Sequence, residues 1–110
     1  MKTALLVVAV AFALTNISCS SWYTKDRTGA TVYKKERNGS SYEKALIIEA
    51  NTTTAGLRAE RFVLAKCFSG YKILSTVYSE YNGNPYHIIT VKTLESERIM
   101  YFDIYRFYGK

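Results

Sequence analysis

Apolar and polar residues follow two different patterns in the middle of the chain. Residues 45–48 form a continuous apolar run bounded by charged residues, and its β-branched content predicts a buried strand. Residues 55–68 then place apolar side chains at helical spacing, after a group of N-cap candidates at 51–54. This spacing predicts a helix of about four turns. The residues expected to share its buried face are Leu57, Glu60, Val63, Leu64, Cys67 and Phe68.

Three further strands are predicted after the helix. Residues 71–81 and 86–93 both alternate, and the Asn-Gly-Asn-Pro sequence at 82–85 between them predicts a hairpin with a four-residue loop. After a second turn at 94–97, residues 98–107 form the closing strand, with Met100, Phe102 and Ile104 on one face. The order β-α-β-β-β predicts an α+β fold in which one helix packs on a four-stranded, mainly antiparallel sheet.

One helix covers only one face of such a sheet, so the opposite face is open to water, covered by the N-terminal segment or used for binding. Tyrosine is abundant, with ten residues, and most of them lie in or near the predicted strands. A tyrosine side chain combines apolar area with a hydroxyl group, which suits a half-exposed sheet face. The tyrosines expected to form a binding surface are Tyr71, Tyr81, Tyr86, Tyr101 and Tyr105.

The N-terminal residues have the pattern of an export signal. Lys2 provides a positive start, and residues 4–14 follow as eleven consecutive apolar residues. At 1.5 Å per residue such a helix reaches only about half of a roughly 30 Å bilayer core, so a spanning helix is not expected. We therefore expect residues 1–18 to be a signal peptide, and the competing interpretation is that the apolar run belongs to the folded core.

Two processing routes are compatible with this signal. The sequence Ile17-Ser18-Cys19 resembles the lipobox of bacterial lipoproteins, which predicts lipid attachment at Cys19 and a location in the bacterial cell envelope. Asn16, however, stands where such signals usually carry leucine. In the alternative, ordinary signal peptidase cuts at Ser18-Cys19-Ser20, the product is secreted, and a disulfide is able to join Cys19 to Cys67.

Residues 19–41 are rich in charge, glycine and serine, and we expect a basic flexible tether there. A short edge strand over residues 31–34 is the alternative. We expect the folded domain to span residues 42–110. The chain carries a net charge of +6, but residues 20–41 contribute +3 of this and residues 42–110 only +2. This distribution argues against nucleic acid as a partner and favours contact of the tether with an anionic membrane.

Motifs for catalysis are missing from the sequence. The chain has no G-x-S-x-G, no nucleotide-binding glycine loop, no H-E-x-x-H and no C-x-x-C, and it has a single histidine. We therefore assign no catalytic residue, no cofactor and no metal site. His87 is expected opposite Glu80 in the hairpin. Glu60 lies on the apolar helix face and is expected to pair with Arg98 or Arg106, because an unpaired buried carboxylate is costly.

Several short segments resemble small uncharacterised bacterial exported proteins. They are residues 56–60, 69–72, 82–86 and 101–104, together with the C-terminal Gly109-Lys110. The resemblance covers residues 42–110 and implies no known activity. The predicted element order is also similar to that of cystatin-like and PepSY-like folds, which is an analogy of fold only. The loop sequence Gln-x-Val-x-Gly of cystatins is absent.

These observations predict a non-enzymatic binding module, anchored to a membrane through Cys19, that holds a protein or glycan ligand, or a second copy of itself, on its open sheet face. The alternative is a soluble secreted inhibitor of an envelope or host enzyme that acts through the hairpin tip at residues 82–85. A small hydrolase ranks third.

Overall fold

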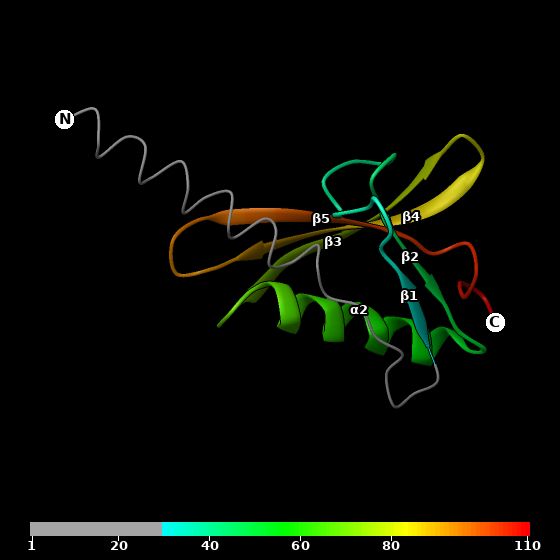
Figure 1. Cartoon of the computed structure of the whole chain (residues 1–110), viewed down its shortest axis with the longest axis horizontal. Coiled ribbons are helices and arrows are strands. Elements are labelled where there is room, and N and C mark those ends of the chain that lie inside the picture. Colours follow the sequence, from blue (N-terminus) through cyan, green and yellow to red (C-terminus); the bar gives the residue numbers. More distant parts are fainter. Residues whose placement is uncertain (1–29) are drawn as a thin grey trace.

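The computed structural model describes residues 30–110, so the expected signal peptide, lipidation at Cys19 and the first part of the tether lie outside the described residues. The elements are β1 (Thr31–Tyr33), β2 (Leu46–Glu49), α2 (Thr53–Cys67), β3 (Lys72–Tyr81), β4 (Asn84–Lys92) and β5 (Glu97–Asp103) (Figure 1). The α+β class and the single helix on a sheet are confirmed for this part of the chain. The sheet has five strands rather than four.

The additional strand is β1, within the segment expected to be a flexible tether. β1 pairs antiparallel with β2, with Val32 opposite Ile48. The side chain of Val32 is only 1% exposed, so this strand contributes to the core. Residues 31–33 thus form the short edge strand that is the alternative to a tether in this segment.

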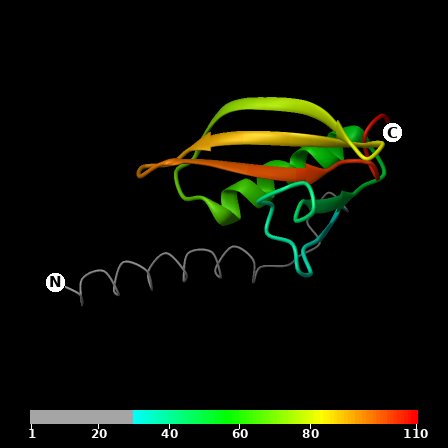
Figure 2. The same ribbon diagram turned by 90° about the horizontal axis from the view of Figure 1, so that it is seen from above.

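The strands lie in the order β1-β2-β5-β4-β3. All neighbours are antiparallel except β2 and β5, which run parallel. The chain leaves β2 through α2, crosses one face of the sheet and enters β3 at the far edge (Figure 2). It then returns through β4 to β5, which fills the gap beside β2. A parallel pair requires such a long connection.

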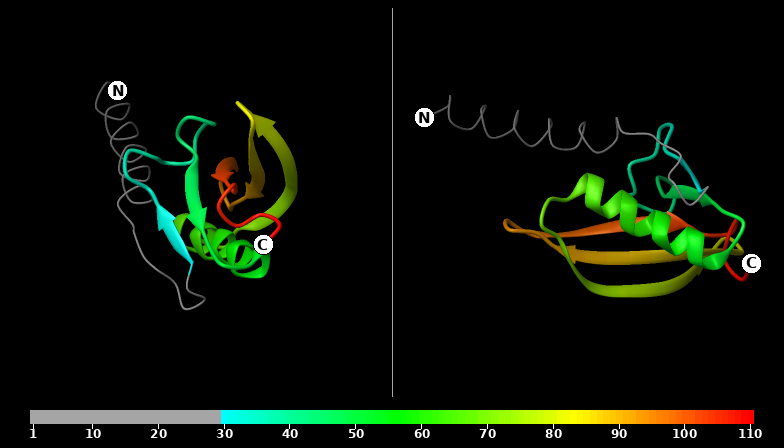
Figure 3. Two further views of the ribbon diagram at one scale, coloured as in Figure 1. Left: turned by 90° about the vertical axis from the view of Figure 1, so that its right-hand side faces the viewer. Right: turned by 90° about the horizontal axis from the view of Figure 1, so that it is seen from below.

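α2 begins where the polar residues at 51–54 predict it. The Thr52 hydroxyl accepts a hydrogen bond from the backbone N–H of Ala55 at 3.1 Å and so caps the helix. The helix lies across one face of the sheet (Figure 3) and buries Gly56, Ala59, Glu60, Val63 and Leu64. Leu57, expected on this face, is 40% exposed instead. The buried face is centred on residues 56, 59, 60, 63 and 64, and Leu57 lies at its edge.

The hairpin between β3 and β4 is tighter than predicted. Its turn consists of Asn82 and Gly83, which have φ angles of 52° and 80°, and Tyr81 pairs directly with Asn84. An Asn-Gly pair adopts this left-handed conformation readily, and a two-residue turn of this kind matches the twist of the strands. Because the loop has two residues and not four, His87 lies opposite Tyr78, and the expected pairing with Glu80 is wrong.

The last strand is shorter than predicted. β5 ends at Asp103, and the chain then turns so that Ile104 and Phe107 both enter the core with no exposed surface. The backbone N–H of Ile104 bonds to the carbonyl of Pro85, and the N–H groups of Phe107 and Tyr108 bond to the carbonyl of Ile104. The alternation at 98–107 therefore continues only to Asp103, and a turn carries the last apolar side chains beneath the sheet.

The C-terminal turn and α2 meet at a glycine. A Cβ atom added at Gly56 would overlap the ring of Phe107, which is completely buried. Glycine in the middle of a helix costs about 1 kcal/mol relative to alanine, so its presence here reflects the close approach of the ring.

We expect the variant Gly56→Ala to be less stable by about 1–3 kcal/mol, because the overlap with Phe107 outweighs the gain in helix propensity. Urea unfolding followed by far-UV circular dichroism measures the change. Thr54→Ala, at an exposed position of the same helix, is the matched control and should be neutral or slightly stabilising. A Gly56→Ala protein as stable as the parent would contradict this packing.

Candidate functional site

The sheet face opposite α2 is the region for which the sequence predicted binding. The strand registers place Tyr81, Tyr86 and Tyr101 on this face, whereas their neighbours His87 and Phe102 point toward the helix. Tyr71 packs instead against the core on the helix side. Tyr105 follows the end of β5 and is 64% exposed. The structure therefore brings together three of the five predicted tyrosines.

The three tyrosines surround a fourth, Tyr42, which the sequence analysis did not single out. Its ring stacks on Tyr81 with centroids 4.3 Å apart and nearly parallel planes. It also meets Tyr86 and Tyr101 edge to face, each at 5.0 Å. The Tyr42 hydroxyl shares a 2.7 Å hydrogen bond with the Ser79 hydroxyl. We call Tyr42, Tyr81, Tyr86 and Tyr101 the tyrosine cluster; it forms a small second core on the open face.

The loop between β1 and β2 places Tyr42 over the sheet. The backbone carbonyl of Gly39 accepts a hydrogen bond from the N–H of Tyr101 at 2.8 Å, which attaches the loop to β5. The Arg37 guanidinium donates to the carbonyl of Ala45 at 2.9 Å and closes the loop. No periodic pattern of apolar residues marks this loop in the sequence, because its tertiary contacts depend on backbone groups and one ring.

Polar contacts at the rim hold the tyrosine cluster in place. The Tyr81 hydroxyl donates a 2.6 Å hydrogen bond to the Glu43 carboxylate. This bond lowers the pKa of Glu43 and, by the same stabilisation of the phenol form, raises the pKa of Tyr81. Burial raises the pKa of Tyr86. Both shifts favour the neutral phenol forms of Tyr81 and Tyr86. The rings of the cluster are in contact with one another.

Beside the tyrosine cluster, part of the open face stays exposed and aliphatic. Val77 lies directly opposite Ile88, and Ile99 lies diagonally from Ile88 on the neighbouring strand. Val77 is 50% exposed and Ile99 is 53% exposed, while Ile88 is half-buried. We call these three residues the aliphatic strip. Side chains of this kind on adjacent strands form one continuous apolar surface.

On the helix side, the structure joins Glu60 to His87. The Nδ1 atom of His87 is 2.6 Å from Oε2 of Glu60, and the two residues are only 8% and 2% exposed. The expected partners of Glu60 lie elsewhere: Arg98 is over the Phe68 ring and Arg106 over the Tyr33 ring. The alternation of β4, in which Ile89 and Val91 are buried, directs His87 to the same face, where its imidazole comes within hydrogen-bond reach of Glu60.

This buried pair connects α2 to β4. A carboxylate at Nδ1 orients an imidazole, but a general base also needs a nucleophile within hydrogen-bond reach. Within residues 30–110, Glu60 is the side chain that hydrogen-bonds His87, and the nearest ring is that of Tyr108, edge to face at 6.1 Å. Burial raises the pKa of Glu60 despite the opposing hydrogen bond from His87.

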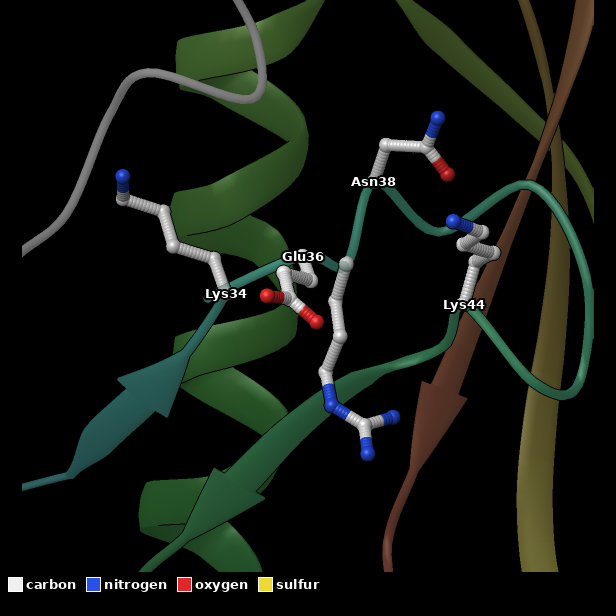
Figure 4. Close-up of a pocket in the computed structure, with 5 residues that line it drawn as sticks. Lys34, Glu36, Asn38 and Lys44 are labelled. Atoms are coloured by element: carbon white, nitrogen blue, oxygen red, sulfur yellow. The ribbon is translucent and has the colours of Figure 1, made fainter.

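Two shallow depressions are among the larger ones on the surface of residues 30–110. One of about 380 Å³ is lined by Lys34, Glu36, Arg37, Asn38 and Lys44 (Figure 4). In Figure 4, the side chains of Lys34 and Lys44 lie apart and do not converge on one point, and Arg37 is already bound to backbone carbonyls. The other, of about 310 Å³, lies between the end of α2 and the β4–β5 turn and is lined by residues 67–69, 93–96 and 98.

Cys67 takes part in a disulfide bond, and the described residues contain no free cysteine. The chain has one other cysteine, Cys19, which lies outside the described residues. Lipid attachment at Cys19 and a bond from Cys19 to Cys67 require the same sulfur atom. The two processing routes predicted from the sequence therefore exclude each other.

Comparison with known proteins gives no relatives: no family model, curated protein or solved structure matches the chain. Among residues 30–110, no group of three or more potential metal ligands is found. The single helix of this part falls short of what is needed to cross a membrane in length and apolar character.

We expect Tyr42→Ala to lower the free energy of unfolding by about 2–3 kcal/mol, because it removes one stacked and two edge-to-face contacts and one hydrogen bond. Tyr42→Phe, which keeps the ring, should cost only about 0.5–1.5 kcal/mol. Urea unfolding measures both values. Tyr105→Ala is the control, since an exposed tyrosine outside the cluster should change stability by less than about 0.5 kcal/mol. Equal stability of Tyr42→Ala and Tyr105→Ala would exclude a structural role for the cluster.

The Glu60–His87 pair predicts a specific pH dependence. The folded-state pKa of Glu60 is raised above 4.5, so folding favours its protonated form. This contribution is complete below pH 4.5 and is lost as the pH rises through the raised pKa. The stability of the parent should therefore fall relative to Glu60→Gln over this range, as measured by denaturant unfolding at a series of pH values. Glu95→Gln, at an exposed position, should follow the parent. A constant difference between the parent and Glu60→Gln would contradict the shift.

Proposed function

We propose that this protein is an exported, non-catalytic module that binds a partner protein through the aliphatic strip. The exposure of Val77 and Ile99, both about half accessible on an ordered strand, carries this proposal. An exposed apolar surface on a rigid sheet is disfavoured in water unless it has a partner, and such surfaces are common at protein interfaces. The tyrosine cluster borders the strip through Tyr101, which lies opposite Ile88.

A protein fits this surface better than a glycan. Sugar recognition usually combines a free aromatic face with polar groups, and the aromatic rings of this sheet face are stacked on one another. What remains is mainly aliphatic, and the hydroxyl groups beside it on this face are those of Ser75 and Thr90. We therefore propose a partner that presents an apolar surface of its own, in place of the protein or glycan expected from the sequence.

The proposed location is extracytoplasmic. The N-terminal pattern of residues 1–18 supports export, and the disulfide at Cys67 supports an oxidising compartment. Since Cys19 is the only other cysteine of the chain, the disulfide favours the secreted form over the lipid-anchored form. The lipid-anchored form at Cys19 remains the alternative proposal, in which Cys67 would need a cysteine of another molecule.

The secreted form is also compatible with the second candidate function, inhibition of an envelope or host enzyme. The hairpin tip expected to enter such an enzyme is a two-residue turn, and Tyr81 beside it is bound to Glu43. A turn of this size presents little surface to an active site. The aliphatic strip is therefore the better supported site of contact.

Photo-crosslinking tests the proposed binding surface. We would replace Ile99 with p-benzoylphenylalanine and irradiate the full-length chain in envelope and culture fractions of the source organism. We expect one discrete adduct. An excess of unlabelled parent protein should abolish this adduct by competition, whereas an excess of unlabelled Ile99→Asp protein should leave it unchanged. The same probe at Arg58, on the exposed face of α2, is the matched control and should give no such adduct.

The mass of the adduct separates this function from self-association. An adduct of twice the mass of the chain reports a second copy and would not support binding of a partner protein. The same adducts from positions 99 and 58, or none from position 99, would overturn the proposal.

A further inference from the structure

The outer edge of β3 is the longest unpaired strand edge in the described part of the chain. β3 is the last strand of the sheet, has ten residues and is paired only with β4. The strand at the opposite end, β1, has three residues. Every second residue of an edge strand directs its backbone N–H and C=O groups outward, where they are able to pair with another strand.

The middle of β3 lacks the features that usually protect such an edge. Residues 73–79 contain no charge and no proline, and residues 74–78 are all exposed. Three of them are large and apolar: Leu74 and Tyr78 are each 45% exposed, and Val77 is 50% exposed. The one protective feature is a register shift between Ile73 and Ser75, which lies toward one end of the strand. Residues 74–78 therefore combine unpaired backbone N–H and C=O groups with exposed apolar side chains.

We propose that a second copy of the chain pairs with this edge, antiparallel, about a two-fold axis at Thr76. The exposed run is symmetric about this residue: Leu74 of one copy would lie opposite Tyr78 of the other, and Thr76 opposite itself. The charges agree with this direction, because Lys72 and Glu80 are at the two ends of the strand. An antiparallel copy brings each Lys72 end to a Glu80 end, whereas a parallel copy brings like charges together.

The product is a continuous ten-stranded sheet with both helices on one side. Both aliphatic strips then lie on the opposite side, so the dimer presents two copies of the surface proposed for the partner protein. The register shift at Leu74 disturbs the pairing at both ends of the interface, and we therefore expect a reversible dimer. The two proposals share Val77, but the dimer uses the backbone edge of β3 and the partner site uses the face around Ile99, so Thr76→Lys and Ile99→Asp test them separately.

Analytical ultracentrifugation of the full-length chain over a range of concentrations tests the interface. The parent should show a reversible monomer–dimer equilibrium. Thr76→Lys places two ammonium groups opposite each other at the two-fold axis and should weaken association by about fivefold or more. Thr54→Lys, an equal change of charge at an exposed position of α2, is the matched control and should associate like the parent. Circular dichroism establishes that both variants are folded.

A crosslink tests the register directly. Cysteines placed at Thr76 would face each other across the two-fold axis at a distance that a disulfide spans. We expect Thr76→Cys to form a covalent dimer under mild oxidation much faster than Thr54→Cys. A parent that stays monomeric at every concentration, an unchanged association of Thr76→Lys, or equal crosslinking of the two cysteine variants would each overturn the proposal.

Discussion

The packing of α2 on one face of the sheet is the contact on which the rest of this structure depends. It buries Ala59, Val63 and Leu64 completely against side chains of β2, β4 and β5. Close approach is possible because Gly56 leaves space for the ring of Phe107 from the C-terminal turn. A single helix covers only one face of the five-stranded sheet. The apolar side chains on the other face therefore have to be covered by another part of the chain, by a partner or by water.

The loop that precedes β2 covers part of the other face. Tyr42 fills the space between the tyrosines of three strands, and the hydroxyl groups at the edge bond to Ser79 and Glu43. Tyrosine suits this position because its ring makes apolar contacts with the neighbouring rings while its hydroxyl group remains near water. The loop covers one end of the face and leaves the aliphatic strip at the other. The contacts of Tyr42 therefore hold the loop in place at one end of the face, and the other end remains the exposed surface proposed for binding.

The Glu60–His87 pair shows how the main core accommodates two ionisable groups. Each would be costly to bury alone, and together they form one short hydrogen bond between the helix and β4. The pair lies under the sheet, away from the aliphatic strip. The two residues thus join α2 to the sheet inside the core.

The sequence by itself determined the elements whose signals are local. Alternation located β3, β4 and β5, the helical spacing and Thr52 located α2, and the α+β class followed from their order. Tertiary structure decided the rest. The turn at Asn82 has two residues and not four, which places His87 opposite Tyr78, and the packing of α2 on this face then supplies Glu60 as its partner. Likewise, Tyr42 and Val32 lie in a segment of mixed polarity, and only the surface across from them makes their burial favourable.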